Sequence, residues 1–356
     1  MPNLTWEHVM DDLTPDPQLY NVPFRADEYR GMPYRYVGAS GLRASAIGLG
    51  TWKFGYPGTG DGARVGEEDA LALLDRAAEL GVTLWDTANR YNAASGNSER
   101  VIGQWLARHP GRRRDVVLAT KTFGGMDGTT PNHSGLSRLQ IIQSVKASLA
   151  RMQTDYIDLL WFHGFDDHVP VAESLETVED LISQGLVNYL AVSNVEHGQL
   201  SAYLDVAGTL SRRVRPVAVQ NRYDPLNGET RPGVLELSAG EGIAFVPYSP
   251  LAQGLLTDRY LDPAAAGPGD RLYDEGLLDG VATAENLKKV RRLAELARLW
   301  RVPISTMVLA YILTLPGMGP QIPSSSTIDQ LEANTRAGTT ALTRDQTDAV
   351  HDVFTG

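Results

Sequence analysis

The most informative absence in this 356-residue sequence is cysteine, of which there is none. Without thiols the chain has no disulfide bonds, no thiolate metal site and no cysteine nucleophile. Long apolar runs are also absent, since no stretch reaches the ~18 residues that a transmembrane helix needs. The first residues, MPNLTWEHVMDD, are acidic and lack the basic start and apolar core of a secretory signal. We therefore expect a cytoplasmic protein.

Positive charge is in short supply. The chain has 32 Lys and Arg against 43 Asp and Glu, which gives a formal net charge of -11. An acidic surface repels phosphate backbones and anionic lipid headgroups, so we expect neither nucleic acid nor a membrane as a partner. Apolar residues make up 42% of the chain, which is normal for a globular protein and too high for a disordered one.

Short apolar runs rich in β-branched residues alternate with helical patterns from about residue 34 onward. Segments such as EEDALALLDRAAEL carry apolar residues at helical spacing, and Gly81 follows the last apolar turn, as at many helix ends. The apolar runs number eight: Ala46–Trp52, Thr83–Ala88, Val116–Lys121, Tyr156–His163, Asn188–Asn194, Val217–Asn221, Ile243–Tyr248 and, with the weakest signal, Gly319–Pro323.

Runs that are apolar throughout indicate strands buried on both faces, as in a parallel sheet. Eight strand–helix units predict an α/β fold, a (β/α)8 TIM barrel over residues 34–356. A doubly wound open sheet is the alternative, but the first strand–helix turn, GLGTWKFGYPG, is not a dinucleotide fingerprint. Residues 251–318 form a long loop insertion after strand seven, and such insertions are usually functional. Residues 1–33 show no clear period, and we interpret them as an N-terminal arm that wraps the surface, meets a partner subunit or is disordered.

Polar residues end several of the predicted strands. Asp86 ends the second run, with Tyr91 shortly after it, Lys121 ends the third and His163 the fourth. Since the C-terminal ends of barrel strands meet at one mouth, we expect these four side chains to lie together. Lys121 closes the apolar run VVLATK and is costly to bury without a partner, which Asp86 offers.

A phenol, an ammonium, a carboxylate and an imidazole suit carbonyl reduction. A tyrosine hydroxyl has a reference pKa of ~10 and is a poor acid near neutrality, but a nearby ammonium lowers that pKa. A carboxylate keeps the ammonium charged, and a histidine at the mouth can donate a hydrogen bond to a carbonyl oxygen. The pattern therefore indicates a proton-donor site, with a nicotinamide supplying the hydride.

With these residues the chain resembles an aldo-keto reductase over roughly residues 33–355. The N-terminal segment of the match, MPYRYVGASGLRASAIGLGTW, is most similar to the bacterial glyceraldehyde-phosphate reductase-like branch and the potassium-channel β-subunit branch of the family. The resemblance implies a reductase of aldehydes or ketones that uses a nicotinamide cofactor and that can also oxidise alcohols in the reverse direction. The segments that carry it, in matching order and spacing, are MPYRYVGASGLRASAIGLGTW, DTANRYNAASGNSERVIG, ATKTFG, LARMQTDYIDLLWFH, YLAVSN, AVQNRYDPLN, PYSPLAQGLLTDRYL and IPSSSTIDQLEAN.

The resemblance also implies roles for individual residues. The catalytic set falls on Asp86, Tyr91, Lys121 and His163. Tyr91 would be the acid, Lys121 and Asp86 would lower the pKa of its hydroxyl, and His163 would donate a hydrogen bond that orients the substrate. The cofactor contacts fall at strand ends and in the C-terminal motif: Gly50, Thr51, Trp52, Ser193, Asn194, Gln220, Tyr248, Ser249, Pro250, Leu251, Gly254, Ser324, Ser326, Gln330 and Asn334.

Departures from the family pattern bear on the cofactor and the substrate. The loop Ser324–Ser326 lacks the Lys or Arg with which many members bind the extra phosphate of NADPH. Arg259 and Arg271, which match phosphate contacts in the channel-subunit branch, are the candidate replacements. We expect NADPH, with NADH as the alternative. Gly164 stands where the reductase branch tends to have Arg, which makes the pocket roomier and disfavours a phosphorylated substrate. The mixture of aromatic residues with Asn, Asp and His at the pocket mouth favours a polar carbonyl such as a sugar or hydroxy-aldehyde.

Two other functions stay open. Lys121 is a candidate nucleophile for a Schiff-base aldolase on the same fold. The channel-subunit resemblance also allows a nicotinamide-binding regulatory subunit with little turnover. We expect no metal, because the acidic stretch Asp166–His168 consists of adjacent residues, which rarely ligate one ion. A homo-oligomer is left open by the N-terminal arm.

Overall fold

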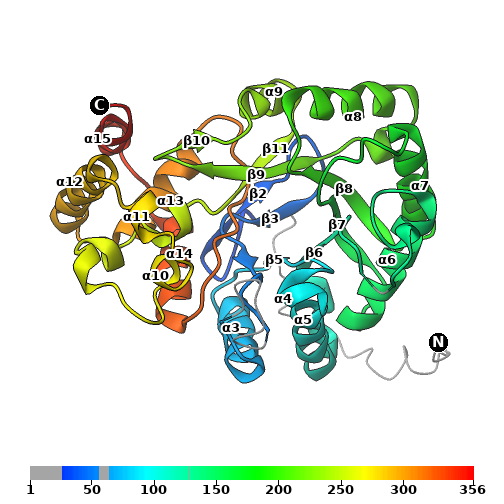
Figure 1. The fold of residues 1–356 in the computed structure, drawn as a ribbon, viewed down its shortest axis with the longest axis horizontal. Coiled ribbons are helices and arrows are strands. Elements are labelled where there is room, and N and C mark those ends of the chain that lie inside the picture. The colour runs from blue at the N-terminus through cyan, green and yellow to red at the C-terminus, as the bar shows by residue number, and fades with distance from the viewer. Residues whose placement is uncertain (1–25, 56–63, 127) are drawn as a thin grey trace.

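The chain folds into a barrel of parallel strands surrounded by helices (Figure 1). The computed structural model describes residues 26–55, 64–126 and 128–356. Seven parallel strands lie next to one another in the order of the sequence, as the predicted (β/α)8 barrel requires. They are β4 (Leu49–Gly50), β5 (Leu84–Asp86), β6 (Val117–Thr122), β7 (Ile157–Phe162), β8 (Val187–Ser193), β9 (Ala218–Asp224) and β11 (Ala244–Tyr248), with a short antiparallel β10 (Gly228–Glu229) on the end of β9.

The eighth strand position closes the ring without a regular ladder. Isolated bridges join Met318 to Phe245 of β11, Gln321 to the residues before β4, and Ser324 to the end of β4. The predicted run Gly319–Pro323 contains two prolines, which have no N–H to donate, so continuous pairing is interrupted. The ring is nonetheless complete, and the predicted fold is confirmed.

Helices cover the outside of the barrel and turn an apolar stripe toward the strands. Side-chain caps begin several of them: Ser137 before α6 and Thr327 before α14 accept hydrogen bonds from the backbone N–H groups of Gln140 and Gln330. The covering helices are α3 (Glu67–Glu79), α5 (Asn97–Arg108), α6 (Arg138–Met152), α7 (Val171–Ser183), α8 (His197–Thr209), α9 (Val234–Gly240), α13 (Ile304–Thr314), α14 (Ile328–Thr339) and α15 (Arg344–Thr355).

A small antiparallel sheet plugs the N-terminal end of the barrel. Val37, which directly follows β2, and Ala44 of β3 pack against residues of the barrel interior such as Leu159. Gly38 in the connecting turn has a φ of +60°, and an added Cβ would lie 2.5 Å from the backbone oxygen of Val217, so only glycine fits there. A ligand must therefore enter from the opposite end. The strands of the plug are β1 (Glu28–Tyr29), β2 (Met32–Tyr36) and β3 (Arg43–Ser45).

The predicted N-terminal arm, residues 1–33, lies largely outside the described residues. Its described part, residues 26–33, forms β1 and the start of β2 and so belongs to the plug. Arg43 of β3 donates a hydrogen bond to the backbone oxygen of Ala26 at 3.0 Å, which connects the start of this segment to the plug.

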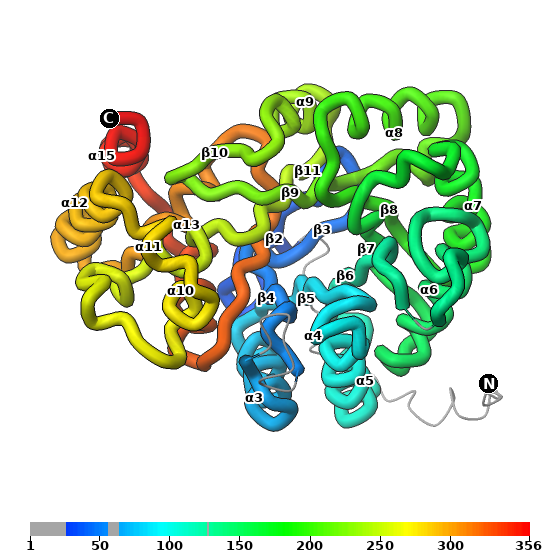
Figure 2. The backbone as a smooth tube through the Cα atoms, viewed as in Figure 1, coloured from blue at the N-terminus to red at the C-terminus, as the bar shows by residue number. Residues whose placement is uncertain are grey.

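The predicted insertion after strand seven consists of short helical pieces. Figure 2 shows α10, α11 and α12 gathered on the side of the barrel where the chain returns through the eighth strand position. This places Arg271, at the start of α10, next to the open end of the barrel. The pieces are the 3-10 turns Ala252–Gly254, Asp258–Tyr260 and Pro263–Ala265 and the helices α10 (Arg271–Asp274), α11 (Leu278–Val281) and α12 (Ala284–Trp300).

Among the described residues, no single helix is both long and apolar enough to span a membrane. Helices α12 and α13 meet that requirement only when taken together, and a bend of 95° separates them. Most of α13 is buried within the protein.

Candidate active site

A buried ion pair lies where β5 and β6 end. The Nζ of Lys121 donates a hydrogen bond to the carboxylate of Asp86 and another to the backbone oxygen of Thr87 at 2.8 Å. The same Nζ donates to the hydroxyl oxygen of Tyr91 at 3.0 Å. Lys121 has no exposed surface and Asp86 almost none. The structure thus brings together three of the four residues that the sequence assigns to catalysis.

The ion pair keeps Lys121 protonated. Burial alone would lower the pKa of Lys121, but the charge of Asp86 and the phenol of Tyr91 outweigh burial and raise that pKa. Burial raises the pKa of Asp86 above its usual value, and Lys121 and the Nε2 of Gln220, which donates to Asp86 Oδ1 at 3.0 Å, limit that rise. A buried charge without a partner is strongly unfavourable, so the contact with Asp86 keeps the amine of Lys121 in its charged form.

Tyr91 stands at the start of a strained turn, α4 (Tyr91–Ala94). Asn92, Ala93 and Ala94 have φ values of 63°, 56° and 59°, in the left-handed region that residues other than glycine seldom adopt. Asn92 is buried, and a Cβ added to Gly55 would lie 2.3 Å from its side chain. The loop after β4 therefore packs tightly on this turn and fixes the position of Tyr91. Such strain persists only where the surroundings hold it, and functional sites are a common place for it.

His163 follows β7 and completes the group. Its ring centroid lies 6.1 Å from that of Tyr91, with an angle of 73° between the ring planes. Burial, together with the positive charges of Lys121 and Arg90, lowers the pKa of His163 to about 3. The imidazole is therefore neutral near pH 7, with one nitrogen as donor and the other as acceptor.

Three amide and hydroxyl groups connect the strand ends across the open mouth. Asn194 donates from Nδ2 to the backbone oxygen of His163 at 2.9 Å and accepts from the hydroxyl of Tyr248 at 2.9 Å. Ser193 donates to the backbone oxygen of Gln220 at 2.8 Å. These bonds link β7, β8, β9 and β11, so the polar groups of the mouth are held in place before any ligand binds.

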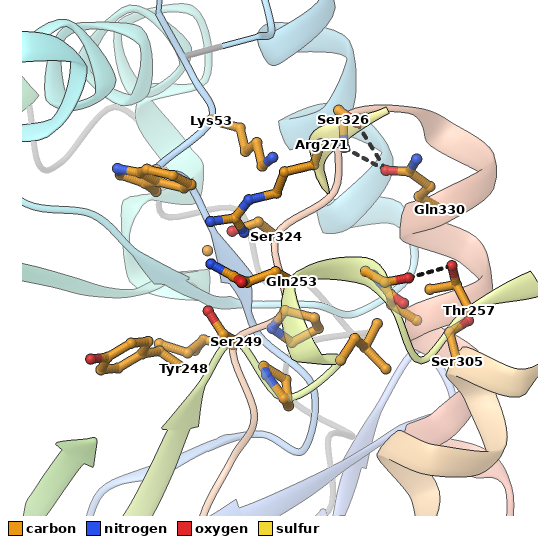
Figure 3. A pocket seen from close by; sticks show the side chains of 18 of the residues that line it. Lys53, Tyr248, Ser249, Gln253, Thr257, Arg271, Ser305, Ser324, Ser326 and Gln330 are labelled. Atoms are coloured by element: carbon orange, nitrogen blue, oxygen red, sulfur yellow. Dashed lines mark hydrogen bonds between the residues drawn. The ribbon is translucent and has the colours of Figure 1, made fainter. Parts of the chain in front are cut away.

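A cavity of about 620 Å³ runs from the catalytic group toward the start of α14. Figure 3 shows the part of its lining that carries Tyr248, Ser324 and Gln330. Three of the predicted site residues do not line it, because Thr51, Ser193 and Lys121 are fully buried behind its wall. Thr51 instead donates to the backbone oxygen of Asp86 at 3.0 Å and supports the end of β5. The predicted residues that line the cavity are Gly50, Trp52, Asp86, Tyr91, His163, Asn194, Gln220, Tyr248, Ser249, Pro250, Leu251, Gly254, Arg259, Arg271, Ser324, Ser326, Gln330 and Asn334.

The polar groups of the cavity fit a nicotinamide dinucleotide at both ends. Near the catalytic group, Asn194 and Gln220 present amides, which match the donors and acceptors of a carboxamide. At the far end, Gln330 accepts hydrogen bonds from the backbone N–H and the hydroxyl of Ser326 at 2.9 and 3.0 Å. Asn334 donates to the hydroxyl of Ser325 at 3.1 Å. This end offers hydroxyls and amides suited to the sugar and phosphate of a nucleotide.

The two arginines of the insertion occupy different environments. Arg259 forms an ion pair with Asp270 at the rim, and 44% of its side chain is exposed. Arg271 reaches inward, where its Cζ lies 4.7 Å from the ring centroid of Trp52 and its Nε donates to Glu275 at 2.9 Å. Of these two arginines, only Arg271 is therefore held inside the cavity.

The sequence did not predict several of the residues that line the cavity. The most unexpected is Lys53, which directly follows Trp52 and is almost fully buried. The available signal was its position, because a lysine in the otherwise apolar and glycine-rich segment GTWKFG is unusual in a chain with only five lysines. The others include Arg64, Gln253, Thr257 and Ser305.

The residues Asp166–His168 have a structural role in the loop after β7. The carboxylate of Asp166 accepts hydrogen bonds from the backbone N–H groups of Leu136 at 2.8 Å and His168 at 3.0 Å. Within the described ranges, no cluster of three or more His, Asp or Glu side chains is arranged to hold a metal ion.

The sequence profile described as the Aldo/keto reductase family matches residues 46–354. Aldo-keto reductase AMT2 of Alternaria alternata is 33% identical over 301 residues, covering 78% of this chain and 80% of the relative. L-glyceraldehyde 3-phosphate reductase of Escherichia coli (strain K12) is 29% identical over 320 residues, covering 87% and 89%. A probable voltage-gated potassium channel subunit beta of Arabidopsis thaliana is 29% identical over 316 residues, covering 86% and 91%. The last two represent the branches that the sequence resembles, and the resemblance is confirmed.

Proposed function

The chain belongs to the aldo/keto reductase family, and on that premise we propose that it reduces aldehydes or ketones with NADPH, using Tyr91 as the proton donor. The observation that carries the proposal is the 3.0 Å contact between the Tyr91 hydroxyl and the Nζ of Lys121 at the wall of the cavity. This contact joins an acid to the charge that makes it effective.

Each catalytic residue has a distinct task in this reaction. Bound NADPH would supply a hydride to the carbonyl carbon. Tyr91 donates a proton to the carbonyl oxygen, and Lys121 stabilises the phenolate that remains. Asp86 keeps Lys121 protonated, and the neutral His163 donates a hydrogen bond that orients the carbonyl oxygen. In the reverse direction, the same residues would support the oxidation of an alcohol.

The cofactor would be held along the whole cavity. Asn194 and Gln220 suit the carboxamide, and the ring of Tyr248 suits stacking on the nicotinamide. Ser324, Ser326, Gln330 and Asn334 would hold the adenosine-phosphate end. We retain NADPH over NADH because Arg259 and Arg271 line this cavity and arginine favours phosphate.

The test is a fluorescence titration with NADPH and NADH, followed by a panel of aldehydes and ketones. We expect NADPH to bind more tightly, and nicotinamide absorbance to fall during turnover with at least one carbonyl. Binding of neither cofactor would reject the proposal.

A polar carbonyl such as a sugar or hydroxy-aldehyde is the substrate class we favour. The catalytic end of the cavity presents hydroxyl, imidazole and amide groups, which pair with substrate hydroxyls. Gly164 places no charged side chain beside His163 to bind a substrate phosphate. In the panel, glyceraldehyde should therefore have a higher kcat/KM than its 3-phosphate.

The aldolase alternative requires Lys121 as an uncharged nucleophile. Its ion pair with Asp86 and its raised pKa keep the amine protonated, which disfavours that role. Borohydride should accordingly fail to trap a keto substrate on Lys121.

A regulatory subunit is the second alternative, favoured by the similarity to the plant protein named as a probable channel subunit. Tight NADPH binding with very slow turnover on every carbonyl of the panel is the result that this function predicts. The complete set of Asp86, Tyr91, Lys121 and His163 around the cavity supports the enzyme instead.

A further inference from the structure

A second buried ion pair lies on the outer side of β6, and the proposed reaction does not use it. The Nε of Arg151, in α6, donates a hydrogen bond to Glu99 Oε2, in α5, at 2.6 Å. Glu99 has no exposed surface, and Arg151 is only 7% exposed. The other carboxylate oxygen of Glu99 accepts from the hydroxyl of Thr120 at 2.6 Å. Thr120 directly precedes Lys121 in β6, so the pair is joined to the strand that carries the catalytic amine.

The same ion pair holds the start of α5, which follows the turn of Tyr91 almost directly (Figure 1). A Cβ added to Gly96, between α4 and α5, would lie 2.5 Å from Cδ of Arg151, so the stem of the arginine packs against this joint. Within the turn, Asn92 Oδ1 accepts from Asn97 Nδ2, in α5, at 2.9 Å. The position of Tyr91 therefore depends on where α5 begins.

A neighbouring hydroxyl connects this helix start to two further strand ends. Ser98 Oγ lies 2.7 Å from Thr51 Oγ1 and 2.9 Å from Thr87 Oγ1, both within hydrogen-bond distance. The backbone oxygen of Thr87 in turn accepts a hydrogen bond from Lys121 Nζ. The first turn of α5 is thus linked both to the segment that carries the phenol and to the ammonium.

The strained turn of Tyr91 needs such support, because strained backbone persists only where its surroundings hold it. A buried ion pair is suited to this task. Moving Glu99 away from Arg151 would leave two buried charges unpaired, which is strongly unfavourable. The helix start therefore cannot shift without a large cost in free energy.

We propose that Glu99 and Arg151 are positioning residues for the reduction, because they fix the start of α5 and thereby hold the Tyr91 hydroxyl against the Nζ of Lys121. Neither belongs to the described residues that line the cavity, so both act through Tyr91 and not on a ligand. The expected effect on the rate rests on the proposed function, whereas the effect on the position of Tyr91 does not.

The test replaces the ion pair by neutral groups of similar shape, Glu99→Gln together with Arg151→Met, which we call the neutral-pair variant. The glutamine keeps an oxygen for the hydroxyl of Thr120, and no charge is left buried alone. The control is Asp158→Asn together with Arg113→Met. It removes a partly buried ion pair of 2.9 Å near the start of β7, at the end of the barrel away from Tyr91. A cooperative thermal transition checks that each protein folds.

In the neutral-pair variant, kcat should fall about tenfold because the phenol and the ammonium are no longer held in contact. KM for the carbonyl and the affinity for NADPH should stay near the wild-type values. In alcohol oxidation, the pH at which the rate reaches half its maximum should rise, because a displaced ammonium stabilises the phenolate less. A pair that only stabilised the fold would not move that pH. The control should keep the wild-type kcat and pH profile, and the same result in the neutral-pair variant overturns the proposal.

If the neutral-pair variant does not fold, Thr120→Val takes its place, since it removes only the hydroxyl that joins Glu99 to β6. Its control is Thr177→Val, because the hydroxyl of Thr177 is also buried and donates at 2.6 Å, to the backbone oxygen of Glu173 in α7. We expect kcat to fall about threefold in Thr120→Val and to stay unchanged in Thr177→Val. Equal rates in the two variants then overturn the proposal.

The position of Tyr91 is also measured without turnover. In spectra of ring-labelled tyrosine, the Tyr91 signal, assigned with Tyr91→Phe, should be shifted or broadened in the neutral-pair variant and unchanged in the control. If the wild type binds no NADPH and reduces no carbonyl, the proposed function fails, and this signal alone decides. A Tyr91 signal that is identical in the wild type and the neutral-pair variant overturns the proposal.

Discussion

Two lysines of the same cavity show how differently burial acts on an amine. Lys121, at the catalytic end, is fully buried, yet its pKa rises because Asp86 and Tyr91 contact its Nζ. Lys53, on the loop after β4, is slightly more exposed, and its pKa falls to about 7 because burial lowers it and the charges of Arg271 and Arg64 lower it further. Burial lowers the pKa in both places, and the charge of the nearest partner decides the outcome.

The two amines therefore differ in how firmly each holds its proton. A permanently charged Lys121 suits a step in which a phenolate must be stabilised on every turnover. Lys53, with a pKa lowered to about 7, does not carry a fixed charge of this kind. Variants of the residues around the cavity test this contrast, and we expect the largest effect at Asp86, the partner on which Lys121 depends.

Asp86→Asn should have the largest effect, because it leaves Lys121 buried without a counter-ion. We expect a loss of about 3–5 kcal/mol in the free energy of unfolding, measured by urea denaturation. Asp180→Asn is the matched control, since Asp180 pairs with Arg138 at the surface, with about half of each side chain exposed. Its loss should stay below about 1 kcal/mol. Similar losses in the two variants would show that the buried ion pair contributes no more to the free energy of unfolding than a surface pair does.

Tyr91→Phe should lower the reduction rate by about 100-fold or more, because the proton donor is removed while the ring stays. Affinity for NADPH should be nearly unchanged, as measured by fluorescence titration. A variant that keeps the wild-type rate would remove Tyr91 from the proposed role and, with it, the reason for holding Lys121 charged.

Arg259→Ala should weaken NADPH binding about fivefold and leave NADH almost unaffected, if Arg259 contacts the additional phosphate. The effect should be smaller than that of Tyr91→Phe because Arg259 is partly exposed and already paired with Asp270. It should also shrink at high salt, because salt screens charges that are exposed to solvent. Equal weakening of both cofactors would exclude contact with that phosphate.

His163 should show no protonation change at all between pH 5 and pH 8. Burial and the charges of Lys121 and Arg90 hold its pKa at about 3, so the ring gains a proton only below that range. Nitrogen chemical shifts of isotope-labelled histidine provide the measurement. A titration midpoint near the ordinary value of ~6.5 would mean that His163 meets solvent and is not the buried neutral donor.

The repeating units of this fold could be predicted from the sequence because strand and helix periods are local properties. Each of the seven β-strands of the barrel lies in or next to a predicted apolar run, as β6 (Val117–Thr122) does with Val116–Lys121. The weakest prediction, Gly319–Pro323, forms only isolated bridges, because its prolines cannot donate to a ladder. The contacts among Asp86, Tyr91 and Lys121 follow from the same local reasoning, since the ends of parallel strands must meet.

What the sequence alone determined, therefore, is the barrel and the set of reactive groups at its open end. The tertiary structure decided which groups face the cavity: Thr51 and Ser193 are turned into supporting hydrogen bonds, and Arg271 points inward while Arg259 stays at the rim. It also decided the character of Lys53, whose neighbours Arg64, Arg271 and Glu275 come from other segments of the chain. The physical reason is that hydrophobic periodicity acts along the chain, whereas burial and Coulomb interactions act through space.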